Sequence, residues 1–120
     1  MRPLVLAISC ASLVALPGFA QAHAVITRSS IGEKPLAAGQ AVQVTLYFNS
    51  AIETSHSTVN LVGADGKTTK LDVVPGGHEP GALIVALPAL VAGSYALRYR
   101  VLAADGHVTE NVLRFQVAVP

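Results

Sequence analysis

The chain has 120 residues, of which 52% are hydrophobic and 12% are charged. Its 8 lysine and arginine residues nearly balance its 7 aspartate and glutamate residues, so there is no basic stripe of the kind that binds nucleic acid and no polybasic patch for a membrane surface. One cysteine and one methionine are present, Cys10 and Met1, which excludes a framework of disulfides.

The first 22 residues have the pattern of a cleaved secretory signal. The positive charge of Arg2 precedes an apolar run over residues 3–16, and residues 20–22, Ala-Gln-Ala, form an A-x-A cleavage site. The apolar run is too short to span a bilayer of about 30 Å comfortably. We therefore expect a signal peptide over residues 1–22 and one soluble periplasmic domain over residues 23–120. Removing 22 of the 120 residues leaves 98, enough for one domain, and that domain contains neither cysteine nor methionine.

The mature chain alternates short runs rich in apolar and β-branched residues with turn signals. Residues 41–48, for example, alternate strictly between apolar and more polar side chains, which predicts a half-buried strand. The pair Asp65-Gly66 predicts a hairpin turn. The predicted strands cover residues 24–30, 41–48, 57–62, 68–74, 82–87, 94–102 and 112–119. About seven strands at this spacing predict an all-β fold, an immunoglobulin-like β-sandwich.

The start of the strand over residues 94–102 has the pattern of a tyrosine corner. Gly93 is followed two positions later by Tyr95, after a long connection. We expect Tyr95 to be a core residue whose hydroxyl bonds to the backbone, rather than a redox-active tyrosine.

The histidines supply the candidate chemistry. After cleavage, His23 would carry an α-amine next to its imidazole, and Asp105 and His107 are two residues apart, so that both can face one site in an extended segment. The start of the first strand and the loop before the last strand can lie at one end of a sandwich, which would bring three nitrogen atoms and a carboxylate oxygen together. Such a donor set suits Cu(II). Spacing alone leaves open that Asp-Gly is an ordinary turn beside a solvated histidine, and we interpret His56 and His78 as such surface residues.

Three stretches resemble the CopC family of periplasmic copper-binding proteins. They are AHA at residues 22–24, VQVTLYFNSAIE at residues 42–53, and AGSYALRYRVLAADGHVTENVLRFQV at residues 92–117. The last stretch is similar to the family signature Gly-x-Tyr-x-x-x-Trp-x-Val-x-x-x-Asp-x-His. The resemblance implies a Greek-key β-sandwich that binds one Cu(II) through His23, Asp105 and His107.

The sequence also departs from the family pattern. Family members with a Cu(I) site have a methionine-rich loop in mid-chain, and residues 62–81 contain no methionine, so the resemblance is to the Cu(II)-only branch. Ser50 stands where the family has an acidic residue thought to support the N-terminal amine, with Asn49 in place of the family's serine. Tyr99 stands where the family usually has tryptophan.

The resemblance implies a binding protein rather than an enzyme: a periplasmic carrier or buffer for Cu(II) in copper resistance or homeostasis, with an inner-membrane copper transporter as a partner. Two alternatives from other classes stay open. An N-terminal histidine with a second histidine is similar to the histidine brace of copper oxidoreductases, although 98 residues and few aromatic side chains suit that class poorly. A metal-free immunoglobulin-like interaction domain would be indifferent to the removal of His23.

Overall fold

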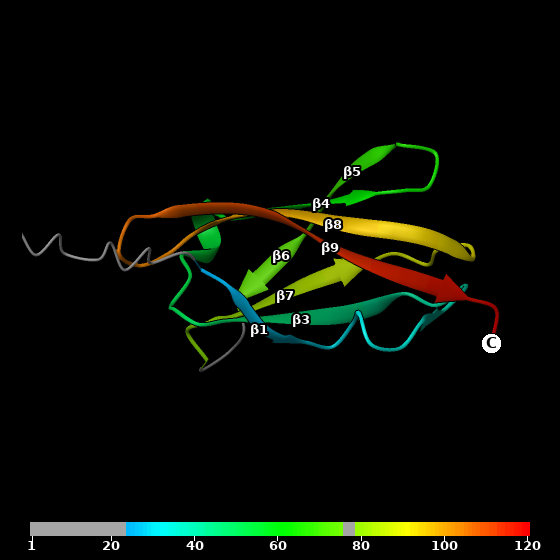
Figure 1. Ribbon diagram of the computed structural model, residues 1–120, viewed down its shortest axis with the longest axis horizontal. Coiled ribbons are helices and arrows are strands. Elements are labelled where there is room, and N and C mark those ends of the chain that lie inside the picture. The colour runs from blue at the N-terminus through cyan, green and yellow to red at the C-terminus, as the bar shows by residue number, and fades with distance from the viewer. Residues whose placement is uncertain (1–23, 76–78) are drawn as a thin grey trace, which may run out of the picture.

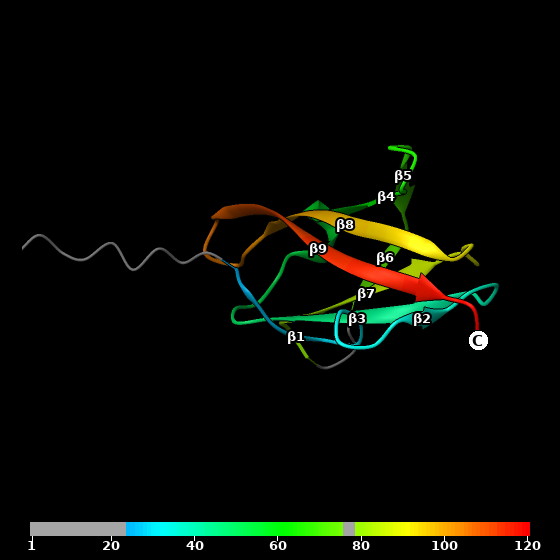
Figure 2. The same ribbon diagram turned by 45° about the vertical axis from the view of Figure 1, so that its right-hand side comes forward.

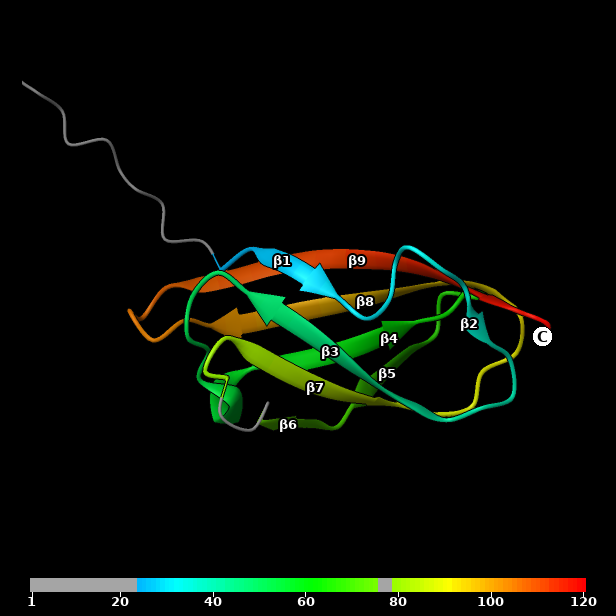
Figure 3. The same cartoon turned by 90° about the horizontal axis from the view of Figure 1, so that it is seen from below.

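The computed structural model describes residues 24–75 and 79–120, which form two β-sheets that face each other (Figure 1, Figure 3). The four-stranded sheet has the order β1 (Ile26–Ser29), β3 (Val42–Phe48), β7 (Ala82–Leu87), β6 (Val73–Pro75). The five-stranded sheet has the order β2 (Leu36–Ala37), β9 (Val108–Ala118), β8 (Gly93–Leu102), β4 (Thr58–Val62), β5 (Thr68–Leu71). Within the described residues the one helical element is the 3₁₀ turn η1 (Thr54–His56), and no helix there is long and apolar enough to cross a membrane.

The all-β sandwich predicted from the alternating pattern is confirmed, with a larger number of strands. The described residues contain nine strands, where the pattern predicts about seven. β2 is too short for any alternation to be recognised, and it pairs in parallel with the end of β9 (Figure 2). The strand predicted over residues 68–74 is divided at Asp72: β5 pairs with β4 and β6 pairs with β7, so the chain crosses from one sheet to the other.

The core lies between the inner faces of the two sheets. In β3, Val44 and Leu46 are fully buried and Phe48 is nearly so, as the alternation predicts. Val42, which the pattern assigns to the same face, is 38% exposed at the first position of the strand. Phe48 of one sheet meets Tyr99 of the other edge-to-face, with ring centroids 5.6 Å apart and an interplanar angle of 73°. This aromatic contact helps to fix the two sheets against each other.

The tyrosine corner predicted at the start of β8 is present. The Tyr95 hydroxyl donates a hydrogen bond to the carbonyl oxygen of Val91 at 2.7 Å. Its ring stacks on Phe115 of β9, with centroids 5.7 Å apart. Tyr95 is therefore a structural residue that ties the connection before β8 to the sheet.

One end of the sandwich gathers segments that are far apart in the sequence. The β8–β9 hairpin, η1 and the start of β1 all lie at this end (Figure 1). The segment before η1 is bonded to the end of β8, because the Glu53 N–H donates to the Leu102 carbonyl oxygen at 2.8 Å. The candidate site residues lie in this region.

Candidate metal centre

The connection between β8 and β9 is a tight loop over residues 103–107. The Ala103 N–H donates to the His107 carbonyl oxygen, and the Gly106 N–H donates to the Ala103 carbonyl oxygen, both at 2.9 Å. Gly106 has a φ of +93°, a conformation that glycine adopts without the strain other residues would suffer. The Ala104 N–H donates to the Ala51 carbonyl oxygen at 2.9 Å, so the loop is fastened to the body of the domain.

This loop brings the predicted site residues Asp105 and His107 together. Asp105 Oδ1 accepts a hydrogen bond from the His107 N–H at 3.0 Å and lies 3.2 Å from His107 Nδ1. The side chains are 43% and 66% exposed, respectively, so both are accessible from solvent. A carboxylate at one ring nitrogen fixes the orientation of an imidazole and leaves its other nitrogen to bind a metal.

The backbone of the loop favours the charged form of Asp105. The His107 N–H is the main cause that holds the pKa of this carboxyl below its ordinary value, and the His107 ring contributes in the same direction. Partial desolvation acts in the opposite direction and is outweighed. Asp105 is therefore a carboxylate at neutral pH, ready to accept a hydrogen bond or to bind a cation.

The first described residues of the domain are fixed beside this loop. The Ala24 N–H donates to Thr109 Oγ1 at 3.1 Å, and Thr109 lies two residues after His107. Ala24 itself is 1% exposed. On its other side, Val25 is bonded twice to Asn49: its N–H donates to Asn49 Oδ1 at 2.9 Å, and its carbonyl oxygen accepts from the Asn49 N–H at 3.0 Å. A residue of β9 and the residue that follows β3 in the other sheet thus hold residues 24 and 25.

The other predicted residues do not join the pair. His23, the third predicted ligand, and His78 lie outside the described residues. His56 is an exposed residue of η1, with its Nδ1 3.1 Å from Ser55 Oγ. Within residues 24–75 and 79–120, no group of three or more histidine, cysteine, aspartate or glutamate side chains could hold a metal ion, so the described residues supply two of the three predicted ligands.

Sequence reasoning missed the two residues that hold the start of the domain. Thr109 lies three residues before the strand predicted over residues 112–119, whereas β9 begins at Val108, and no pattern marks its hydroxyl as an acceptor. In the sequence, Asn49 is distinguished only because it stands in place of the family's serine. Its neighbour Ser50, in the family's acidic position, has a buried hydroxyl with no hydrogen-bond partner among residues 24–75 and 79–120.

The family model of the CopC domain matches residues 26–118. The chain belongs to the CopC domain family. The match includes Asp105 and His107 and begins three residues after His23. Among curated proteins, none matches this CopC domain at the level of sequence.

Solved structures support the same fold. The crystal structure of CopC from Methylosinus trichosporium OB3b has a TM-score of 0.69 to this CopC domain at 25% identity, over 81% of this chain and 95% of that chain. PcoC, a methionine-rich copper resistance protein from Escherichia coli, has a TM-score of 0.60 at 21% identity, over 81% of this chain and 100% of that chain. The selenomethionine form of PcoC has a TM-score of 0.56 at 19% identity, over 78% and 99% of the two chains. The likeness to PcoC concerns the fold alone.

Proposed function

We propose that the mature domain is a periplasmic carrier or buffer for copper, which binds one Cu(II) through the His23 α-amine and imidazole, Asp105 and His107. The single observation that carries this proposal is the hydrogen bond from Ala24 to Thr109. It ties the residue next to His23 to the strand that begins one residue after His107. Membership of the CopC family, which the sequence resemblance describes as periplasmic copper-binding proteins, supplies the cargo.

Covalent geometry supports the proximity of His23 to the Asp105–His107 pair. Consecutive Cα atoms are about 3.8 Å apart, so the Cα of His23 is no farther than that from the Cα of Ala24. Residues 107 and 109 of an extended segment are about 7 Å apart. The donors of His23 therefore come within reach of the Asp105–His107 pair once the preceding residues are removed.

The proposed donor set favours Cu(II) over Cu(I). Amine, imidazole and carboxylate donors suit Cu(II), whereas Cu(I) prefers thiolate and thioether sulfur, which the mature domain lacks. The exposed pair lies on a hairpin loop at the end of the sandwich, which leaves room for a copper acceptor such as an inner-membrane transporter to approach. We infer transfer of copper rather than catalysis on a substrate.

The experiment compares two N-termini. Authentic protein beginning at His23 is titrated with Cu(II) and examined by electron paramagnetic resonance, beside a chain that begins with an additional methionine before His23. The extension occupies the α-amine and should weaken binding by at least about tenfold, the lower limit even for residues that only support a ligand. Equal affinities for the two chains would exclude the N-terminal clamp.

A second comparison tests the loop. His107→Ala should change the nitrogen hyperfine structure of the Cu(II) spectrum, because one of the three proposed nitrogen donors is lost, while His56→Ala is the matched control and should leave the spectrum unchanged. The rival enzyme function is tested in the same samples, because an oxidoreductase would consume oxygen or peroxide in the presence of a reductant. Turnover that depends on bound copper would contradict the proposed carrier.

A further inference from the structure

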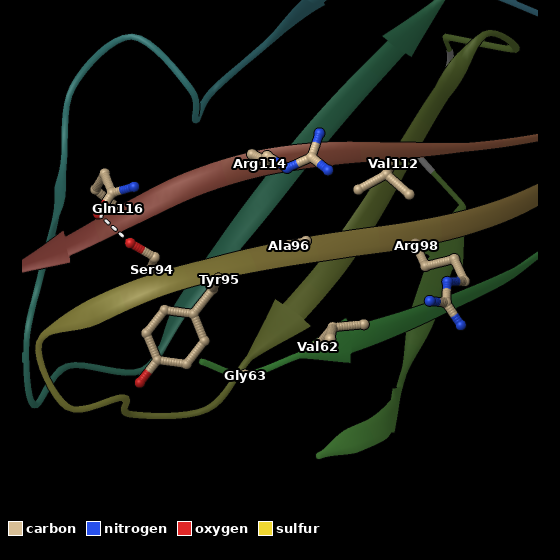
Figure 4. A pocket seen from close by; sticks show the side chains of 9 residues that line it. All are labelled: Val62, Gly63, Ser94, Tyr95, Ala96, Arg98, Val112, Arg114 and Gln116. Atoms are coloured by element: carbon tan, nitrogen blue, oxygen red, sulfur yellow. Dashed lines mark hydrogen bonds between the residues drawn. The ribbon is translucent and has the colours of Figure 1, made fainter. Parts of the chain in front are cut away.

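The outer face of the five-stranded sheet carries a groove that the copper site does not use. It has a volume of about 450 Å³ and lies over β4, β8 and β9 (Figure 4). Its residues on β8 run from Ser94 to Arg98, in the half of that strand farther from the loop at residues 103–107. A molecule bound in this groove would therefore leave Asp105 and His107 accessible.

Two arginines border the groove without a carboxylate partner. Among the described residues, Arg28 pairs with Glu79 and Arg100 with Glu110, whereas no ion pair includes Arg98 or Arg114. Residues 1–23 and 76–78 contain neither aspartate nor glutamate, so those segments have no carboxylate side chain to offer. Two guanidinium groups with their full capacity for bidentate hydrogen bonds thus face the groove.

The floor between the arginines is apolar. Figure 4 shows Arg114 over β9 and Arg98 extending from β8 toward β4. The apolar side chains of Ala96 on β8 and Val112 on β9 lie beside the two arginines. Val112 is 38% exposed. Arginine beside exposed apolar side chains is typical of surfaces that bind other proteins, where lysine is depleted.

The strand register sets the spacing of the two arginines. Arg98 is directly opposite Val112, and Arg114 lies two residues farther along β9. Such diagonal neighbours are about 7–8 Å apart. In an extended peptide, side chains two residues apart point to the same side and are about 7 Å apart, whereas adjacent side chains point to opposite sides.

We propose that this groove binds an extended acidic segment of a partner protein, in which two carboxylates two residues apart pair with Arg98 and Arg114 and the residues around them cover Ala96 and Val112. The partner is a different protein rather than a second copy of this chain, because no two of its seven aspartate and glutamate residues are two positions apart. The surface lies apart from the copper site, so the proposal is independent of the metal assignment.

The test uses labelled peptides and fluorescence anisotropy with the folded domain. The probe is acetyl-Val-Glu-Val-Glu-Val-amide, compared with an isomer in which the two glutamates are adjacent and with a glutamine version. We expect the alternating peptide to bind most tightly. Arg98→Gln and Arg114→Gln should each weaken its binding by about fivefold, the upper range for one exposed ion pair. Binding should also weaken when the ionic strength rises from about 0.01 M to 0.15 M.

Arg28→Gln is the control variant, because it removes the same charge from the other sheet and should leave the affinity unchanged. Equal binding of the adjacent or glutamine peptide would overturn the proposal. An equal loss in Arg28→Gln would do the same, since it would reduce the effect to net charge. A dimer of the domain that Arg98→Gln dissociates would assign the groove to a second copy and also overturn it.

Discussion

At the scale of single residues, Thr109 makes the contact on which the proposed copper site depends. Its hydroxyl accepts the N–H of Ala24, a residue that is almost completely buried. Thr109→Val keeps the shape of the side chain and removes the acceptor, so that the Ala24 N–H loses its partner. We expect the free energy of unfolding to fall by about 1–3 kcal/mol and the affinity for Cu(II) to fall as well, measured by urea unfolding and metal titration.

The control for this prediction is Thr27→Val. The Thr27 hydroxyl donates to the Tyr47 carbonyl oxygen at 3.2 Å, on the β1–β3 pair. Its loss should lower stability without changing Cu(II) affinity. If Thr109→Val and Thr27→Val affect copper equally, Thr109 contributes to the fold and not to the position of His23.

Asp105 gives a prediction for acid stability. Its pKa in the folded protein is lowered from the ordinary value of 3.8, mainly by the His107 N–H. A carboxyl with a lowered folded-state pKa stabilises the fold above its unfolded-state pKa, and this contribution is lost as the pH falls through the folded-state value. We therefore expect Asp105→Asn to reduce the loss of stability of the metal-free protein below pH 3.8, measured by urea unfolding at a series of pH values. Asp65→Asn, in the β4–β5 turn, removes the same charge elsewhere, and an equal effect there would refute the role of the Asp105–His107 contact.

At the scale of elements, the β8–β9 hairpin depends on the conformation of Gly106. Its φ of +93° strains any residue with a side chain, although a Cβ at this position would meet open space. Gly106→Ala should therefore cost about 1–2 kcal/mol of stability and weaken Cu(II) binding by displacing Asp105 and His107. Thermal unfolding and copper titration measure the two effects.

The β4–β5 turn supplies a matched control for this substitution. Gly66 has a φ of +82°, and a Cβ there would also meet nothing within 4 Å. Gly66→Ala should cost a similar amount of stability and leave the affinity for Cu(II) unchanged. Equal weakening of copper binding in both variants would mean that the hairpin loop has no special part in the site.

The strands differ in how well the sequence predicts them. The bounds of β3 and β7 are predicted to within a residue or two, because alternation reports the one buried face of β3 and a continuous apolar run reports the mostly buried residues of β7. The transfer of the chain between sheets at Asp72 was missed, since both halves of residues 68–74 satisfy the same pattern. For the site, the Asp-x-His spacing predicts that Asp105 and His107 face one site, and the structure brings Asp105 Oδ1 to 3.2 Å from His107 Nδ1 across a turn rather than along an extended segment. The contacts of Thr109 and Asn49 join segments far apart in the sequence, and no local pattern contains them.

At the scale of the whole molecule, the two candidate binding surfaces use different parts of one rigid hairpin. β8 and β9 pair continuously from Gly93 with Val117 to Leu102 with Val108. The proposed ligands Asp105 and His107 lie at the turn of this hairpin, and the groove bordered by Arg98 and Arg114 lies in its other half. A partner can therefore bind the groove while the metal loop stays open to an acceptor.

Copper should also stabilise the whole domain, because the proposed ligands come from His23 and from the β8–β9 loop and assemble only when the protein is folded. A ligand at 100 times its dissociation constant stabilises the folded state by about 2.7 kcal/mol. In a domain of this size that corresponds to a rise in Tm of about 10–20 °C. The rise should occur with Cu(II), measured by circular dichroism of the chain that begins at His23, and it should be much smaller for the chain with an additional N-terminal methionine.

Reduction of the metal gives the decisive form of this prediction. Residues 23–120 contain neither cysteine nor methionine, and Cu(I) prefers soft donors, so ascorbate should return the Tm of the copper-loaded protein most of the way to that of the metal-free protein. A Cu(I)-specific chelator should then remove the copper. Adding fresh Cu(II) after the ascorbate and the chelator have been removed should restore the higher Tm. If the reduced protein keeps both its copper and its raised Tm against the chelator, the domain holds a Cu(I) site built from other residues. The assignment to Cu(II) alone would then fail even though the family and the fold stand.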